Sequence, residues 1–272
     1  MRPQLVAPRL LTALAFLAAL LPRAAAAQSI TIDGTLSPAQ TLTGPNYAIA
    51  ANLGKQVGAN LFQSFGKFGL MTGESATFSG PAGIANIIGR VTGGSPSAID
   101  GAIVSAIQGA NLFLVNPFGI VFGAHASINV SGSFHASTAD YVKLSDGAIF
   151  SATNPQGSTF SAAAPAAFGF LNANPPAITV AGSQLAANGT LGLVGGPVTI
   201  TGGSLSAPGG MIHIASAMGP GEIPVDPLHG PAASVTSYGP VSITQGAILD
   251  ASSGGSVFIR AGTLSVDASE IN

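Results

Sequence analysis

The last third of the chain repeats one short pattern of apolar and polar positions. Each copy has an apolar residue, a Ser or Thr, a second apolar residue, and a further apolar residue five positions later. The four copies are Ile178-Thr179-Val180 with Leu185, Val198-Thr199-Ile200 with Leu205, Val241-Ser242-Ile243 with Ile248, and Leu264-Ser265-Val266 with Ile271. Their starting positions give a unit of roughly 20 to 23 residues, and the longer interval between the second and third copies indicates an insertion or a degenerate copy.

Alternation within each copy predicts a strand with one apolar face and one Ser/Thr face. Such short strands cannot bury their apolar faces alone, so a period of this length is typical of a solenoid in which neighbouring units stack. Residues 211–217 and 257–260 provide a second strand for their units. A leucine-rich horseshoe would need a recurring Asn and a helix in each repeat, which this sequence lacks. The pattern therefore predicts an all-β solenoid of the parallel β-helix type.

Several segments interrupt the pattern or lie at its ends. The Pro-rich segment 219–239 and the Ala-rich segment 152–167 read as loops extruded from the solenoid. Near the start, Ile30-Thr31-Ile32 followed by Asp33-Gly34 reads as a strand and turn that cap the first coil. No comparable cap follows 264–271, which suggests a truncated or partial exoprotein.

Composition supports the all-β prediction. The 272 residues include 37 Gly and 19 Pro, and only 7% are charged while 47% are hydrophobic. Roughly one residue in five therefore disfavours a helix interior. The polar residues are mostly Ser, Thr, Asn and Gln, which suit stacked strands and tight turns. Long amphipathic helices are excluded.

The first 27 residues have the organisation of a signal peptide. Arg2 and Arg9 form a basic start, 10–21 is a twelve-residue apolar segment, and 24–27 supplies small residues for cleavage after Ala27. An apolar segment of this length is shorter than the roughly 20 residues that a transmembrane helix needs. We expect an exported mature chain without a transmembrane segment.

Removal of this leader changes the charge balance. It takes away three of the eight basic residues, which leaves five against ten acidic residues and a net charge of −5. Nucleic acid is therefore not an expected partner. There is no cysteine, so an exported chain of this kind must gain its stability from core burial and backbone pairing.

The segment 111–134 combines two apolar runs and a tight turn. The runs 112–115 and 120–122 are joined by Asn116-Pro117-Phe118-Gly119. Asn first, Pro second and Gly fourth are the preferences of a type I turn, because Pro presets φ and Gly relieves the exit. The pattern predicts strand, turn, strand.

Together with the segments 58–78 and 90–103, this stretch resembles the two-partner secretion (TpsA-type) domain that opens filamentous haemagglutinin-like exoproteins. The family pattern is an apolar run, Asn-Pro-Asn-Gly and an Ile-rich strand, and in this sequence Phe118 replaces the second Asn. The upstream Asn-Pro-Asn-Leu element of the family is absent, because residues 82–90 read AGIANIIGR.

The resemblance implies a right-handed parallel β-helix with N-terminal capping strands. It implies a secretion domain over residues 28–222, followed at 223–272 by the start of a β-helical passenger. It further implies recognition in the periplasm by the POTRA domains of an Omp85/TpsB-type outer-membrane transporter of a Gram-negative cell, export as an unfolded chain, and folding at the cell surface or in the extracellular space.

The same resemblance suggests an adhesin that meets a host or neighbouring-cell surface. A contact-dependent toxin or haemolysin with the same opening domain is an alternative. Asn116, Pro117, Phe118 and Gly119 are the candidates for transporter recognition, and a role confined to folding stays open for them. Phe62, Phe65, Phe68 and Phe78 are candidates for packing between an early β-segment and the first coils, or for docking.

Residues that could carry catalysis are sparse. His125, His135, His213 and His229 show no metal-ligand spacing and are expected at the surface or at strand edges. A carbohydrate-cleaving β-helix would need Asp clusters and a basic residue at one site, and no acidic cluster stands out. We expect no enzyme activity, cofactor or metal, and a carbohydrate-binding or carbohydrate-cleaving β-helix is the alternative.

Overall fold

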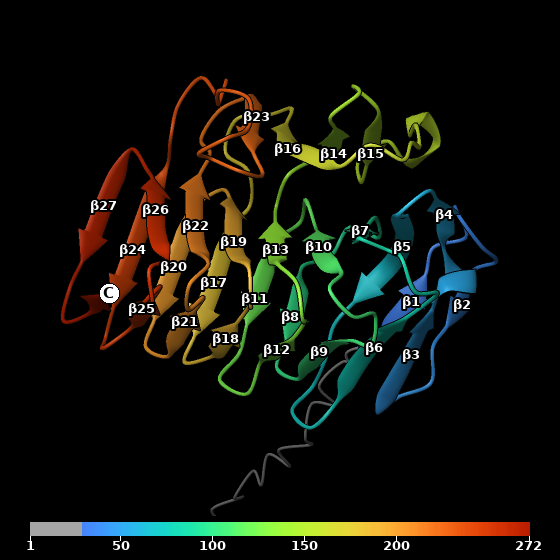
Figure 1. Cartoon of the computed structure of the whole chain (residues 1–272), viewed down its shortest axis with the longest axis horizontal. Helices are drawn as coiled ribbons and strands as arrows, with labels where there is room; N and C mark the ends of the chain where they lie inside the picture. Colours follow the sequence, from blue (N-terminus) through green and yellow to red (C-terminus); the bar gives the residue numbers. More distant parts are fainter. Residues whose placement is uncertain (1–28) are drawn as a thin grey trace, which may run out of the picture.

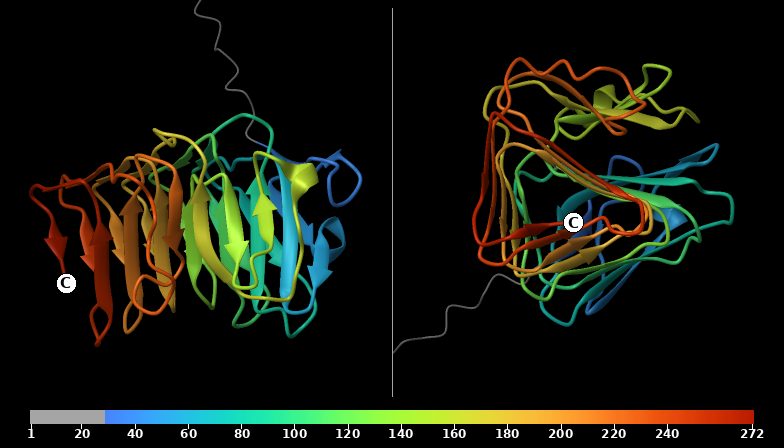
Figure 2. Two further views of the ribbon diagram at one scale, coloured as in Figure 1. Left: turned by 90° about the horizontal axis from the view of Figure 1, so that it is seen from above. Right: turned by 60° about the vertical axis from the view of Figure 1, so that its left-hand side comes forward.

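Each coil of the fold turns through three strands, which give the stacked coils the triangular outline seen in the right-hand view of Figure 2. Buried apolar side chains fill the inside of the coils. The computed structural model describes residues 29–272, so the predicted signal peptide lies outside the described residues. The coils stack from the N-terminal to the C-terminal end as an elongated parallel β-helix (Figure 1). The predicted fold class is confirmed.

Each face of the β-helix is one sheet. In spatial order, the first face contains β2 (Gln40–Thr41), β1 (Ile30–Ile32), β5 (Asn60–Phe68), β7 (Asn86–Val91), β10 (Asn111–Val115), β13 (Phe134–Ser137), β19 (Thr190–Gly195), β22 (Met211–Ser216) and β26 (Ser256–Arg260), with β4 (Lys55–Val57) beside β5. The second face contains β27 (Thr263–Val266), β24 (Pro240–Thr244), β20 (Val198–Thr201), β17 (Ile178–Ala181), β11 (Ile120–Phe122) and β8 (Ser97–Ile99).

The third face contains β28 (Glu270–Ile271), β25 (Ile248–Asp250), β21 (Ser204–Ser206), β18 (Gln184–Ala186), β12 (Ser127–Asn129), β9 (Ala102–Ser105), β6 (Ser75–Ser79) and β3 (Asn46–Ala50). Two short 3₁₀ helices, η1 (Ala51–Leu53) and η2 (Pro155–Gly157), complete the regular elements of the described chain, apart from the side sheet introduced below.

The repeat found in the sequence is the stacking register of the second face. Ile178 pairs with Val198, Val198 with Val241, and Val241 with Leu264. The residues Ile178, Val180, Val198 and Ile200 are buried, whereas the Thr residues between them point outward and are partly exposed. The long interval is a single coil that carries an insertion, because β20 pairs directly with β24.

One position of the predicted repeat is wrong. On the third face Leu249, not Ile248, pairs with Leu205. Leu249 is fully buried and Ile248 is 39% exposed. Residues 245–247 link β24 to β25, whereas only 202–203 link β20 to β21. The additional turn residue shifts the alternation by one, which exchanges the inward and outward positions.

The N-terminal cap is also present as predicted. β1 runs antiparallel between β2 and β5, against the parallel direction of the coils that follow. Ile30 and Ile32 are buried and belong to the interior apolar core. These strands cover the open end of the first coil.

The two interruptions of the repeat leave the solenoid as predicted, but they are more ordered than loops. Both insertions contribute to an antiparallel sheet, which we call the side sheet, with the order β15 (Ile149–Ser151), β14 (Tyr141–Leu144), β16 (Pro165–Phe170) and β23 (Gly221–Pro224). It lies over the first face (Figure 1). A second apolar core, which includes Phe113, Phe150 and Phe168, fills the space between them.

Candidate functional site

The predicted turn joins two faces of the β-helix. β10 ends at Val115 and β11 begins at Ile120, and the two strands belong to different sheets. The Gly119 N–H donates to the Asn116 carbonyl at 3.2 Å and closes the turn. Gly119 has φ +115°, a region that favours glycine. The strand–turn–strand prediction is confirmed, with the turn acting as a corner and not as a hairpin.

The Asn116 side chain is fully buried beneath this corner. Its Oδ1 accepts a hydrogen bond from the Phe118 N–H at 2.9 Å. Its Nδ2 donates to the Ser95 carbonyl at 3.0 Å and to Ser97 Oγ at 2.9 Å, both in the preceding coil. Pro117 and Gly119 are buried too, and Phe118 is partly exposed. In the folded chain the Asn116 amide therefore connects two coils and is not displayed at the surface.

The four candidate phenylalanines are buried, with at most 2% of any residue exposed. Phe65, Phe68 and Phe78 lie inside the β-helix, and the rings of Phe65 and Phe68 meet at a centroid distance of 5.1 Å. Phe62 points the other way and contacts Phe150 of the side sheet at a centroid distance of 5.0 Å. This geometry favours packing over docking for all four.

An asparagine ladder, which was not predicted from the sequence, connects the first three coils. Asn86 Nδ2 donates to Asn60 Oδ1 at 2.9 Å, and Asn111 Nδ2 donates to Asn86 Oδ1 at 3.0 Å. Asn60 Nδ2 continues to the carbonyls of Ser161 and Ala163 in the first insertion at 3.0 and 2.7 Å. The sequence does contain a pattern that indicates the ladder, because each of β5, β7 and β10 begins with Asn followed by two apolar residues.

Arg90 is a second feature that was not predicted from the sequence. It is 1% exposed, at the end of β7. Its Nε donates to Ser64 Oγ at 2.7 Å, Nη1 to the Ser151 carbonyl and Ser158 Oγ at 2.6 Å each, and Nη2 to Thr35 Oγ1 at 2.9 Å. The guanidinium also lies 4.3 Å from the ring centroid of Phe150. One side chain therefore links the cap, the first coils and the side sheet.

Asp33 provides the negative charge near this guanidinium. Its carboxylate accepts hydrogen bonds from the hydroxyls of Thr35, Ser64 and Thr92 at 2.8, 2.6 and 2.9 Å. Burial raises the pKa of Asp33, but the hydrogen bonds from these groups outweigh it and hold the pKa below its ordinary value. Burial lowers the pKa of Arg90 to about 10, against the opposing effect of Asp33, so Arg90 stays charged at neutral pH.

Two of the four histidines contradict the expected surface position. His135 and His213 are 3% and 1% exposed. They point outward from the first face but are covered, since His135 stacks on Phe113 at 4.6 Å and lies near Phe168 of the side sheet. The two insertions leave the solenoid and fold over its first face, and this burial of His135 and His213 cannot be recognised from a local sequence pattern. His125 and His229 are exposed, beside Asp100 and Asp226 respectively.

Within residues 29–272, no group of three or more His, Asp or Glu side chains has the arrangement needed to hold a metal ion. The same part of the chain contains no helix with the length and apolar character of a membrane span.

A family model described as the TPS secretion domain matches residues 28–264, which is most of the chain and nearly all of its coils. The chain belongs to the TPS secretion domain family. The resemblance seen in the sequence is thereby confirmed, and the β-helix described above is that of a TPS domain, the secretion domain of TpsA-type exoproteins.

Among solved structures, this TPS domain is similar to the HMW1 secretion domain from Haemophilus influenzae, with 18% sequence identity and a TM-score of 0.48. The similarity covers 86% of this chain and 63% of the other chain. No curated protein matches the chain. The family match runs past Glu222, and the predicted division of the chain between residues 222 and 223 stays a prediction.

Proposed function

We propose that this TPS domain directs export of its exoprotein through an Omp85/TpsB-type outer-membrane transporter, whose POTRA domains recognise the chain in the periplasm. The family match over residues 28–264 is the observation that carries this proposal. The domain is part of an exoprotein with an adhesin role at a host or neighbouring-cell surface.

The chain passes the transporter unfolded and folds outside. Two properties of the chain support this order of events. It has no cysteine, so no cross-link obstructs threading. Each coil pairs with the preceding coil through parallel strands, so each exposed edge is a template for the next coil.

The Asn116 to Gly119 turn contributes to export chiefly through folding. The Asn116 amide is buried and all its hydrogen-bonding groups are engaged within the protein. A transporter can therefore contact that amide directly only while the chain is unfolded. A buried asparagine elsewhere, Asn86, is the matched control, because it too connects neighbouring coils through its amide but lies outside the turn.

The test is export in cells with and without the partner barrel, for the native chain, Asn116→Ala and Asn86→Ala. We expect the chain in the medium only when the barrel is present, and export losses that follow the loss of stability in both variants. Equal export without the barrel would overturn the proposal. A loss specific to Asn116→Ala at equal stability would assign the amide to recognition of the unfolded chain.

A further inference from the structure

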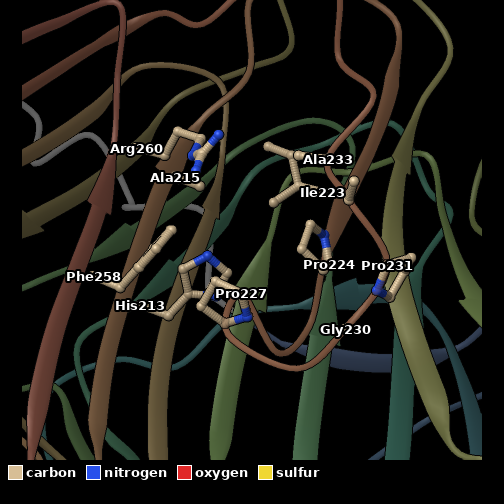
Figure 3. Close-up of a pocket in the computed structure, with 11 residues that line it drawn as sticks. His213, Ala215, Ile223, Pro224, Pro227, Gly230, Pro231, Ala233, Phe258 and Arg260 are labelled. Atoms are coloured by element: carbon tan, nitrogen blue, oxygen red, sulfur yellow. The ribbon is translucent and has the colours of Figure 1, made fainter.

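A cavity lies between the first face of the β-helix and the second insertion, near the C-terminal coils (Figure 3). Its volume is about 280 Å³, close to the lower end of ligand sites at about 300 Å³. The inner wall is formed by His213 and Ala215 of β22 and by Phe258 and Arg260 of β26. The outer wall is formed by Ile223, Pro224, Pro227 and the segment 230–233 of the second insertion.

The register of the first face explains this inner wall. His213 pairs with Phe258, and Ala215 pairs with Arg260. Because side chains alternate along a strand, all four point to the same side, out of the β-helix and toward the insertion. Pro224, Pro227 and Pro231 stand opposite them, and each proline ring fixes its own φ. The cavity is therefore preformed, with apolar side chains on both walls beside the polar side chains of His213 and Arg260.

Arg260 gives the cavity a positive charge, and no carboxylate is among the residues that line it. Within residues 29–272 it makes no ion pair, and its guanidinium lies 5.5 and 5.7 Å from the ring centroids of Phe258 and Tyr238. The two carboxylates of the insertion each pair with a residue other than Arg260, although the charge of Asp226 also acts on His213 and raises its pKa against the larger effect of burial, which lowers it. Glu222 pairs with Lys143 at 3.0 Å and Asp226 with His229 at 3.1 Å, and neither lines the cavity.

We propose that this cavity binds a carboxylate that carries an apolar side group. The carboxylate pairs with Arg260, whose planar guanidinium can donate two parallel hydrogen bonds. The apolar group lies between Phe258 and the prolines. A phosphate carries nearly two negative charges at neutral pH, whereas Arg260 is the single lysine or arginine among the residues that line the cavity. The required chemistry occurs in a free small acid and in the C-terminal residue of a peptide.

The test is titration of the purified chain with N-acetylphenylalanine, its carboxamide, and a tetrapeptide ending in Phe, followed by protein-observed NMR. We expect N-acetylphenylalanine or the tetrapeptide to bind. The affinity of the carboxamide should be lower by roughly tenfold or more, because the carboxamide lacks the negative charge. Preference for the acid assigns the site to a small molecule, and preference for the tetrapeptide assigns it to a peptide end.

Variants distinguish this site from binding elsewhere. Arg260→Gln should lower affinity roughly tenfold or more, and Ala233→Leu should lower it by filling the cavity. Lys67→Gln removes an exposed cation from distant β5. This variant is the matched control and should leave the affinity for the acid unchanged. Undetectable binding of both acids at about 10 mM, or unchanged affinity in Arg260→Gln, overturns the proposal.

Discussion

The carboxamide of Asn116 makes three hydrogen bonds inside the protein, two as donor and one as acceptor. A buried group with this many partners is costly to remove, since each partner is left unsatisfied. Phe118, which stands where the family pattern has Asn, contributes its backbone N–H to the same network and keeps its side chain partly exposed. The turn therefore persists although the family residue is absent.

Asn116→Ala should lower the free energy of unfolding by about 1–3 kcal/mol, because it leaves the Ser95 carbonyl and the Phe118 N–H without partners. Asn116→Asp should cost more, since it keeps the acceptor but buries a charge beside the Ser95 carbonyl. Urea unfolding followed by circular dichroism measures both. An aspartate variant as stable as the native chain would contradict this interpretation of the buried amide.

His135 and His213 should make stability depend on pH. Burial lowers the pKa of His135 to about 3, with a smaller effect from His213, and burial lowers the pKa of His213 to about 4. The unfolded chain takes up protons below its ordinary histidine pKa of 6.5, whereas the folded chain does not. Their contribution is therefore fully present above pH 6.5 and is lost as pH falls toward 4.

The measurement is urea unfolding at intervals between pH 7 and pH 4. The double variant His135→Phe with His213→Phe should flatten the decline in this range, because neither phenylalanine can take up a proton. His125→Gln, a change at an exposed histidine, is the control and should leave the decline in place. An equal slope in the double variant would show that the buried rings are not responsible.

At the scale of elements, the first three coils are held in register by side chains as well as by backbone pairing. Asn60, Asn86 and Asn111 occupy equivalent positions on adjacent parallel strands. The ladder reaches into the first insertion through Asn60. The side sheet is thus attached at one end to the same row of amides that aligns the coils.

Asn86→Ala should lower the free energy of unfolding by about 1–3 kcal/mol, because it removes the middle of the ladder and leaves Asn60 Oδ1 and Asn111 Nδ2 without partners. Denaturant unfolding measures the change. The control is Asn188→Ala, which removes one long, exposed hydrogen bond of 3.4 Å and should cost about 0.5 kcal/mol or less. Equal effects of the two changes would argue against the ladder.

At the scale of the whole molecule, Arg90 joins parts that are distant in sequence. Its partners belong to the turn after β1, to β5, and to the first insertion at Ser151 and Ser158. The cap, the β-helix and the side sheet are thereby coupled through one buried cation. Loss of that cation should loosen both the cap and the side sheet.

Arg90→Gln should lower the free energy of unfolding by about 3–5 kcal/mol, because it removes a buried charge and leaves several acceptors and the nearby Asp33 uncompensated. Arg90→Lys should not restore stability, since an ammonium cannot reproduce the guanidinium fork. Hydrogen exchange should show faster opening of β1 and of β14 to β16. Arg260→Gln, a change at an exposed arginine, is the control for loss of charge alone.

The stacking unit follows from local sequence. An apolar residue, a hydroxyl residue and an apolar residue at the start of each copy can pack only with one face inward, so the register of Ile178, Val198, Val241 and Leu264 could be predicted from local alternation. The corner at Asn116 followed from turn preferences in the same way. Both features depend on residues a few positions apart.

What the insertions cover depends on contacts that only the folded chain makes. The side sheet pairs β14 with β16 and β16 with β23, although β23 comes some fifty residues later in the chain. Phe168 of the side sheet covers His135, and the second insertion covers His213. Attachment of the side sheet also brings Arg90 against Ser151. These contacts join segments far apart in sequence, and their geometry arises only when the coils have stacked. Local patterns specify strands and turns, whereas the environment of each outward-facing side chain depends on the segment that folds over it.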